Sequence, residues 1–307
     1  MSVYVVGHKS PDTDSVTSAI AYAELKKAMG VDAVPAMQGE LNPETTLVLE
    51  KFGFAAPVIM TDGAGKKLIL VDHSDISQAP DNLDKAEIIE IIDHHKIGDI
   101  TTNNPILFNA QPVGCTGTVL KQLFEINNVK ITKNVAGIML AAILSDTVLF
   151  KSPTTTEADK KACDGLAKIA GISDMAALAM EMFKAKSAVA GVPARDLIFR
   201  DYKDFDMKGK KVGCGQLEMV DLSLIDDMRD DLYKTLKEVK EEGGRHTILL
   251  MLTDIMKEGT DLMVISDDVS FVEKAFKVKI DGPTVWIDGM MSRKKQTIPP
   301  LQSAFGC

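Results

Sequence analysis

Gly7-His8-Lys9-Ser10-Pro11-Asp12-Thr13-Asp14-Ser15 is the stretch that decides the fold of this chain, because it joins a strand to a helix. Four apolar residues at 3–6 lead into it and predict a short buried strand. Residues 15–29 follow with helical spacing, and Gly30 stands where a helix commonly ends. The nine residues therefore form the turn after a strand, which is where open α/β sheets bind ligands.

Three side chains of this turn are potential metal ligands. His8 offers an imidazole, Asp12 and Asp14 offer carboxylates, and Pro11 stiffens the loop between them. The competing interpretation is a capped loop with a histidine at the surface, because short motifs also occur by chance. The rest of the chain has to decide between the two.

The composition is that of a globular chain with a sizeable core. The chain has 307 residues, 45% of them apolar, and a net charge of −9. At ~150 residues per domain this length suggests about two domains. The charge argues against nucleic acid held on a broad basic face, and no apolar run approaches the ~18 residues of a membrane span. The cysteines are scattered and the chain enters a strand at once, so we expect reduced thiols, no signal peptide and a cytoplasmic protein.

Strand-like and helix-like segments alternate over the first half of the chain. Strands are predicted at 3–6, near 34, at 67–71 and at 87–92. Helices are predicted at 15–29, 43–52, 116–126, 135–149, 157–170 and 174–183. This order predicts an α/β fold with a mostly parallel sheet flanked by helices.

A segment of small residues, KAKSAVAGVP at 184–193, interrupts this order before strands and helices begin again. Further strands are predicted at 212–218, 247–253, 261–265 and 284–287, and helices at 222–242 and 269–276. We therefore predict a catalytic metal-binding domain at 1–186, a flexible linker at 187–194 and a smaller mixed α/β domain at 195–307.

Two more of the predicted strands end in aspartate and histidine. One runs into Asp72-His73-Ser74 and the next into Asp93-His94-His95. The carboxyl ends of parallel strands lie along one edge of a sheet, so these side chains can meet those of the first turn. Four of the five histidines fall in the three motifs, which argues against a random scatter.

A further candidate ligand, Asp146, lies near the end of a strongly apolar predicted helix. A carboxylate inside such a run is costly unless it is paired or metal-bound, although an exposed helix end would also explain it. The candidate ligands are then His8, Asp12, Asp14, Asp72, His94 and Asp146, with His95 as a further candidate. Their donors favour Mn²⁺, Co²⁺, Mg²⁺ or Zn²⁺, and six such groups suit two ions about 3.5–4 Å apart with a bridging water. Such a water becomes a nucleophile near neutral pH, and its usual substrate is a phosphoester or phosphoanhydride.

Positive charge for a substrate phosphate is concentrated near the C-terminus, in Ser292-Arg293-Lys294-Lys295-Gln296. A short basic run is usually a solvated surface, but a loop presenting Arg293 and Lys294 inward would bind a phosphate. Lys203 is a weaker candidate of the same kind, because exposed lysines are common.

The motifs GHKSPDTDS, VDHS, DHH, SDT and SRKKQ, in this order and spacing, resemble the family II inorganic pyrophosphatases of the DHH phosphoesterase superfamily. The resemblance covers essentially the whole chain. The DHH-type motifs mark only the superfamily, whereas SRKKQ in a C-terminal domain of this size is particular to the pyrophosphatases. The resemblance implies hydrolysis of pyrophosphate to two phosphates, with the active site between a DHH domain and a DHHA2-type domain.

The resemblance also implies which residues bind metal. One ion would be held by His8, Asp12 and Asp72, and the other by Asp14, Asp72, His94 and Asp146, so that Asp72 bridges them. The two ions would be Mn²⁺, with Co²⁺ as a possible substitute, and Mg²⁺ would arrive with the substrate. His73 and Asp93 would orient these ligands.

The remaining implications concern the substrate and the assembly. His95 would contact pyrophosphate and protonate the leaving phosphate. Lys203, Arg293 and Lys294 would bind the substrate, and closure about the linker would complete the site. The family also implies a homodimer formed through the N-terminal domain.

One motif departs from the family pattern, and two alternatives remain. The second motif often reads DHN, and Ser74 replaces the asparagine here, with a small expected effect. There is no room between Asp72 and Asp146 for a regulatory CBS-domain insertion. The closest rival function is another DHH-superfamily phosphoesterase, an exopolyphosphatase or a nuclease of short oligonucleotides, but the sequence lacks a GGGH-like loop. A non-catalytic sensor on this fold is disfavoured, because every expected position is filled.

Overall fold

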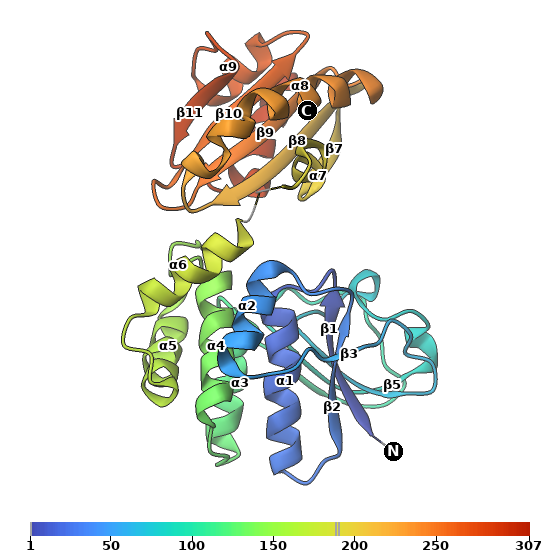
Figure 1. Cartoon of the computed structure of the whole chain (residues 1–307). Coiled ribbons are helices and arrows are strands. Elements are labelled where there is room, and N and C mark those ends of the chain that lie inside the picture. The colour runs from blue at the N-terminus through green and yellow to red at the C-terminus, as the bar shows by residue number, and fades with distance from the viewer. Residues whose placement is uncertain (1, 188, 190) are drawn as a thin grey trace. The chain divides into compact units, whose positions relative to one another are not determined.

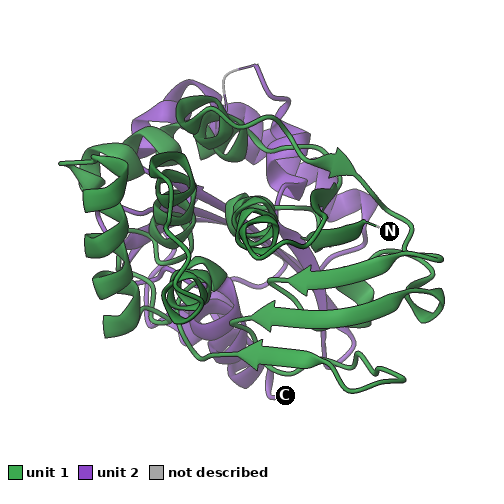
Figure 2. Cartoon of the chain, turned by 90° about the horizontal axis from the view of Figure 1, so that it is seen from below, with its two compact units in different colours: residues 1–186 green, residues 187–307 purple. Residues whose placement is uncertain are grey.

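The computed structural model describes residues 2–187, 189 and 191–307, which form two compact units (Figure 1, Figure 2). Unit 1 is Met1–Lys186 and unit 2 is Ser187–Cys307. The linker predicted at 187–194 includes positions 188 and 190, which lie outside the described residues. Each unit has its own sheet.

Unit 1 is built on a sheet whose described strands all run parallel. They are β1 (Val3–Lys9), β2 (Ala33–Gln38), β3 (Val58–Ile59), β4 (Lys67–Val71), β5 (Glu87–Asp93) and β6 (Leu107–Ala110). Their order across the sheet is β3-β2-β1-β4-β5-β6. β2 and β3 follow β1 on one side of it, and the chain then crosses to the other side of β1, where β4, β5 and β6 follow in order. The strand order therefore reverses between β1 and β4.

Helices pack against this sheet and against one another. They are α1 (Thr13–Ala28), α2 (Pro43–Phe52), α3 (Thr116–Ile126), α4 (Lys133–Asp146), α5 (Glu157–Ala170) and α6 (Met175–Lys186), with short 3-10 turns at Ile76–Gln78 and Leu83–Lys85. α1 lies on β1 and β2, α3 contacts β5, and α4 is surrounded by α1, α3 and α5 (Figure 1). Every residue of α4 from Val135 to Ser145 is buried, which explains its apolar sequence.

Unit 2 has a mixed sheet with helices on both faces. Its elements are α7 (Ala194–Phe199), β7 (Tyr202–Met207), β8 (Lys210–Met219), α8 (Arg229–Glu242), β9 (Thr247–Asp254), β10 (Gly259–Ser266), α9 (Ser270–Phe276), β11 (Thr284–Asp288) and α10 (Ile298–Phe305). The order is β11-β10-β9-β8-β7, and β8 and β9 run parallel while the other pairs are antiparallel. Alternate residues of the buried strand β9 enter different cores, Leu250 with Leu236 of α8 and Leu249 with Leu301 of α10.

The predicted α/β fold, with a mostly parallel first sheet flanked by helices and a smaller mixed α/β second domain, is confirmed. The helix predicted at 135–149 ends earlier, at Asp146, because Val148, Leu149 and Phe150 have φ angles of 48°, 50° and 67°. The helix predicted at 222–242 is divided into a 3-10 segment, Leu222–Met228, and α8. The basic run predicted as a loop forms a π-helical turn, Arg293–Thr297, that continues into α10.

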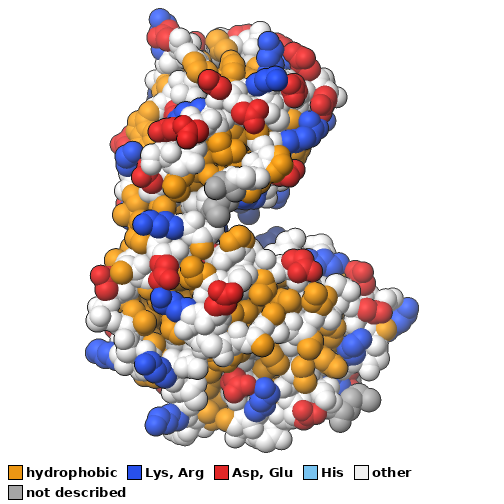
Figure 3. Space-filling view, in the orientation of Figure 1, with side chains coloured by type: hydrophobic (Ala, Val, Ile, Leu, Met, Phe, Trp, Pro, Cys, Tyr) orange, Lys and Arg blue, Asp and Glu red, His pale blue; other side chains and the backbone are white. Residues whose placement is uncertain are grey.

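The remaining features of the structure are its helix lengths, its surface charge and its free thiols. Among the described residues, no helix has both the length and the apolar character that crossing a membrane requires. On the face shown in Figure 3, acidic and basic side chains are interspersed over both units. Cys115, Cys163 and Cys214 are buried free thiols, and Cys307 is exposed.

Candidate metal centre

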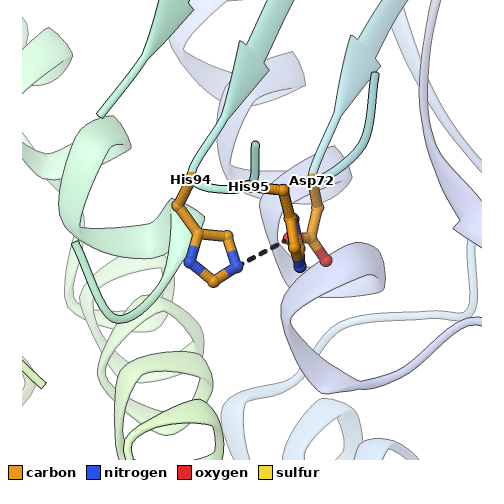
Figure 4. Close-up of side chains that lie close together, drawn as sticks. All are labelled: Asp72, His94 and His95. Atoms are coloured by element: carbon orange, nitrogen blue, oxygen red, sulfur yellow. Dashed lines mark ion pairs between the residues drawn. The ribbon is translucent and has the colours of Figure 1, made fainter. Parts of the chain in front are cut away.

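The carboxyl ends of β1, β4 and β5 bring three of the predicted ligands together. These strands are neighbours in the sheet, so His8 on β1 and the residues that follow β4 and β5 share one edge. Nε2 of His8 lies 3.4 Å from one carboxylate oxygen of Asp72, and Nε2 of His94 lies 3.3 Å from the other. Figure 4 shows His94 and Asp72 pointing toward each other from adjacent strand ends. The cluster therefore lies where the strand order reverses, the usual ligand site of such sheets.

Helix ends supply the remaining carboxylates. Asp12 caps α1 through Oδ1, while its Oδ2 lies 3.4 Å from Nε2 of His8. Asp14 is fully buried in the first turn of α1, and Asp146 is the last residue of α4. Their carboxylate oxygens lie 3.9 and 3.8 Å from Nε2 of His94. The structure thus brings all six predicted ligands into one cluster within unit 1.

Donor atoms within this cluster form groups that are compact enough to surround a cation. Donor atoms lie within 4.8 Å of one another in the groups His8, Asp12, Asp72; Asp72, His94, His95; and Asp14, Cys115, Asp146. Asp72 belongs to two of them. Cys115 is an addition that the sequence did not predict, but burial raises the pKa of its thiol well above the ordinary value, and its sulfur caps α3. Burial thus favours the protonated thiol, and the oxygen and nitrogen donors are better suited to a hard divalent ion.

The carboxylates carry more negative charge than the protein around them neutralises. Burial raises the pKa of Asp14 to about 6, and the charge of Asp72 adds to the effect. Burial also raises the pKa of Asp146 well above its usual range, and the negative charge of Asp14 is the next largest cause. Burial would raise the pKa of Asp72 as well, but its bonds to His8 and His94 outweigh this and lower it. A site that holds protons on buried carboxylates is one in which divalent cations would replace those protons.

The two histidines of the cluster are oriented by backbone carbonyls. Nδ1 of His8 lies 2.8 Å from the carbonyl oxygen of Lys9, and Nδ1 of His94 lies 3.1 Å from that of Val113. A carbonyl only accepts, so each Nδ1 carries a hydrogen and each Nε2 faces the carboxylates. Burial lowers the pKa of both rings, but hydrogen bonds to neighbouring aspartates prevail and raise it, to about 11 for His8 and about 9 for His94. The tautomer is the one that metal-binding histidines use, with the second ring nitrogen held by the protein.

The third histidine, His95, is held by Asp93. The buried carboxylate of Asp93 accepts hydrogen bonds from the backbone N–H of His94 and of His95, and its Oδ1 lies 3.0 Å from Nδ1 of His95. This bond raises the pKa of His95, whose side chain is half-exposed. His73 is buried beside the cluster, with Nδ1 at 2.9 Å from the carbonyl oxygen of Val71.

Two residues that the sequence analysis did not identify hold the carboxylates in place. The backbone N–H of Thr116 donates to Asp14 Oδ2 at 2.7 Å, and its hydroxyl donates to Asp72 Oδ1 at 3.1 Å. Ser18 donates to the other oxygen of Asp14 at 2.7 Å. Ser18 follows Asp14 by one helical turn and could have been found by that spacing. Thr116 lies 102 residues from Asp14, and no sequence pattern connects them.

Ser74, the departure from the family motif, joins two loops behind the cluster. Its hydroxyl donates to the carbonyl of Lys96 at 3.3 Å and accepts from the backbone N–H of Gly98 at 3.0 Å. It thereby links the segment after β4 to the segment after β5. A β-carbon on Gly98 would lie 2.1 Å from the carbonyl oxygen of Ser74, so this close approach requires glycine.

The predicted phosphate-binding residues lie in unit 2. Arg293 donates to the carbonyl oxygen and to the carboxylate of Asp201, at 2.5 and 2.6 Å, and to the carbonyl of Cys214 at 3.3 Å. Lys203 on β7 is exposed and is the cross-strand partner of Cys214, so it lies on the same part of the sheet. Lys294 follows Arg293 in the same π-helical turn and is exposed. Nη1 and Nη2 of Arg293 donate these three hydrogen bonds, all within unit 2.

Known proteins resemble this chain over essentially its whole length. Residues 2–143 match the family model of the DHH family, N-terminal domain, and residues 180–304 match that of the DHHA2 domain. A probable manganese-dependent inorganic pyrophosphatase of Archaeoglobus fulgidus is 58% identical, over 99% of this chain and 98% of that protein. A manganese-dependent inorganic pyrophosphatase of Methanothrix thermoacetophila is 50% identical over the same shares. A crystal structure of a Methanococcus jannaschii putative family II inorganic pyrophosphatase has a TM-score of 0.75 and 45% identity, covering 99% of this chain and all of that one.

Proposed function

The chain belongs to the manganese-dependent inorganic pyrophosphatases, and we propose that it hydrolyses inorganic pyrophosphate to two phosphates at a pair of metal ions held by unit 1. The observation that carries this proposal is the position of Asp72. Its two carboxylate oxygens face His8 on one side and His94 on the other, 3.4 and 3.3 Å away. A single carboxylate shared by two donor sets is what a two-ion centre requires.

The residues of unit 1 divide into two ligand sets around Asp72. We propose that His8 and Asp12 complete the first set and that Asp14, His94 and Asp146 complete the second. The oxygen and nitrogen donors suit Mn²⁺, and Co²⁺ would replace it with the same ligands. Two ions bound there supply a nucleophilic hydroxide at neutral pH and positive charge for the phosphate oxygens.

The backbone of β5 and the residues after it position the proton donor. Asp93 holds Nδ1 of His95, so the free Nε2 of that ring is left to donate a proton to the departing phosphate. The bond to Asp93 favours the protonated ring, as a general acid requires. We propose this role for His95.

Unit 2 contributes the charge that recognises the substrate. We propose that Arg293, Lys294 and Lys203 bind the pyrophosphate oxygens, with Mg²⁺ accompanying the substrate. Arginine forms two parallel bonds to a phosphate, whereas lysine acts as a compact charge. The bonds of Arg293 to Asp201 and Cys214 support this proposal, because they fix the guanidinium before substrate arrives.

The assembly and cellular location are also proposals. The outermost strand β6 exposes Leu107 and Phe108, which are 49% and 42% accessible, and an exposed apolar edge strand favours pairing with a second copy. We propose a homodimer formed through unit 1. Buried free cysteines are typical of reducing compartments, so we propose a cytoplasmic enzyme with no nucleic-acid or membrane partner.

An assay of substrate preference tests the proposal. Metal-free protein is loaded with Mn²⁺ and offered pyrophosphate, a long polyphosphate and a dinucleotide in separate reactions. We expect rapid phosphate release from pyrophosphate and little from the other two, with no activity after chelation. Faster turnover of polyphosphate or of the dinucleotide would show instead an exopolyphosphatase or a nuclease.

A further inference from the structure

We propose that Glu44 is a positioning residue that sets the spacing between Asp14 and Asp146, two ligands of the second ion. The inference rests on the proposed function, because it assumes that these two carboxylates bind an ion. Glu44 itself stands in the first turn of α2, a helix that supplies none of the candidate ligands.

The carboxylate of Glu44 ties together two helix ends. Glu44 is 1% exposed, and its Oε2 accepts a hydrogen bond from Thr13 Oγ1 at 2.8 Å and another from Ser145 Oγ at 2.9 Å. Thr13 immediately precedes Asp14 at the start of α1, and Ser145 immediately precedes Asp146 at the end of α4. One oxygen atom therefore links the two segments that carry the ligands.

A link is needed at this point because the two ligand carboxylates repel each other. Oxygens of Asp14 and Asp146 belong to one group whose donor atoms all lie within 4.8 Å of one another. Asp146 also stands at the C-terminal end of α4, where the helix dipole disfavours negative charge. Both effects favour separation of the end of α4 from the start of α1 whenever the two carboxylates are ionised. The bonds of Glu44 to Thr13 and Ser145 oppose this separation.

The packing of Glu44 does not explain its presence. Its Oε1 is buried and has no hydrogen-bond partner among the described residues, which is unfavourable for a carboxylate. The first turn of α2 tolerates a negative charge because of the helix dipole, but an apolar side chain would fill the space without an unsatisfied oxygen. Thr45 supports the arrangement, since its hydroxyl lies 3.0 Å from that of Thr13. The carboxylate is therefore best explained by the two hydroxyl groups that it holds.

The geometry predicts that removal of Glu44 lowers the affinity for the two ions unequally. Asp14 and Asp146 both belong to the second set, and Glu44 holds the residue before each of them. Asp12, in the first set, has a separate support, because its Oδ1 caps α1 by accepting from the backbone N–H of Ser15 at 2.9 Å. Loss of Glu44 should therefore weaken binding of the second ion much more than binding of the first.

The test compares Mn²⁺ binding in the full chain and in Glu44→Ala, by calorimetric titration and by electron paramagnetic resonance. Mutation of a residue that orients metal ligands typically weakens metal binding by about 10–100-fold. For Glu44→Ala we therefore expect at least a tenfold loss of Mn²⁺ affinity at one of the two sites. The resonance signal of two coupled ions should be replaced by that of a single ion. Thr13→Val, which keeps the side-chain volume, should produce a smaller loss of the same kind and no additional loss when combined with Glu44→Ala.

Glu90→Gln is the matched control. Glu90 is another largely buried carboxylate of unit 1, and its two donors, Tyr22 and Lys26, lie on α1 about two turns or more beyond Asp14. Glu90→Gln should lower the unfolding temperature of the metal-free protein and leave both Mn²⁺ affinities unchanged. Equal weakening of both sites in Glu44→Ala, or unchanged binding in both Glu44→Ala and Thr13→Val, would overturn the inference. Wild-type protein that binds fewer than two Mn²⁺ ions or does not hydrolyse pyrophosphate would instead overturn the proposed function.

Discussion

Replacement of Thr116 by valine is the most direct test of the hydrogen bonds around the bridging carboxylate. The hydroxyl of Thr116 donates to Asp72 Oδ1, while its backbone N–H donates to Asp14 Oδ2. Valine has nearly the same shape and keeps the backbone bond. Thr116→Val therefore removes one hydrogen bond to the carboxylate that both donor sets share.

The size of the effect follows from the geometry of that bond. A hydrogen bond to a charged group contributes about 1.5–3 kcal/mol. The oxygen atoms are 3.1 Å apart, which is long for a hydroxyl that donates to a carboxylate, so the lower value applies. Loss of a partner that orients a metal ligand typically weakens metal binding by about 10–100-fold, and for this long bond we expect the lower end, so Mn²⁺ should bind about tenfold more weakly. Calorimetric titration of metal-free protein with Mn²⁺ measures this change.

Thr118→Val provides the control from the same helix. Thr118 donates to Asp159 at 2.6 Å, and Asp159 is a buried carboxylate outside the donor groups. Both variants should lose a similar amount of folding stability in the metal-free state, because each loses one buried hydrogen bond. Only Thr116→Val should lose Mn²⁺ affinity. Equal affinities in the two variants would refute the role assigned to Thr116.

Three further substitutions test other parts of the structure. Asp72→Ala removes a ligand from both sets, so elemental analysis after dialysis should find neither ion, and retention of two ions would contradict the bridging role. Arg293→Ala should raise the KM for pyrophosphate with unchanged Mn²⁺ affinity, and a parallel loss of metal binding would rule out a purely substrate-binding role. Lys277 ends α9 with a φ of 56°, a conformation that glycine adopts without strain. Lys277→Gly should therefore raise the free energy of unfolding by about 0.5–1 kcal/mol, measured in urea, and a lower value would show that the side chain contributes more than the strain costs.

The sequence by itself determined most of the elements and the six candidate ligands. The helices at Pro43–Phe52, Thr116–Ile126 and Glu157–Ala170 have the predicted limits, because apolar spacing and helix-capping residues are local signals. The clustering of the ligands also followed from a local pattern, since each motif stands at the end of an apolar strand and parallel strands end at one edge. Strands such as β6 and β7 were missed, because they are short or carry alternating polar residues without a clear apolar run.

Tertiary structure alone decided which residues support those ligands. Thr116 meets Asp14 across 102 residues of chain, and Ser145 meets Glu44 across 101. Contacts of this range leave no period or spacing in the sequence, because they depend on which helices pack together and in what register. The end of α4 at Asp146 was also decided by tertiary structure. The apolar spacing of the sequence continues beyond Asp146, but the backbone there is left-handed and the helix stops. Donor chemistry is therefore readable from residue types, whereas the hydrogen bonds that hold donors at a fixed spacing arise only when the helices are packed.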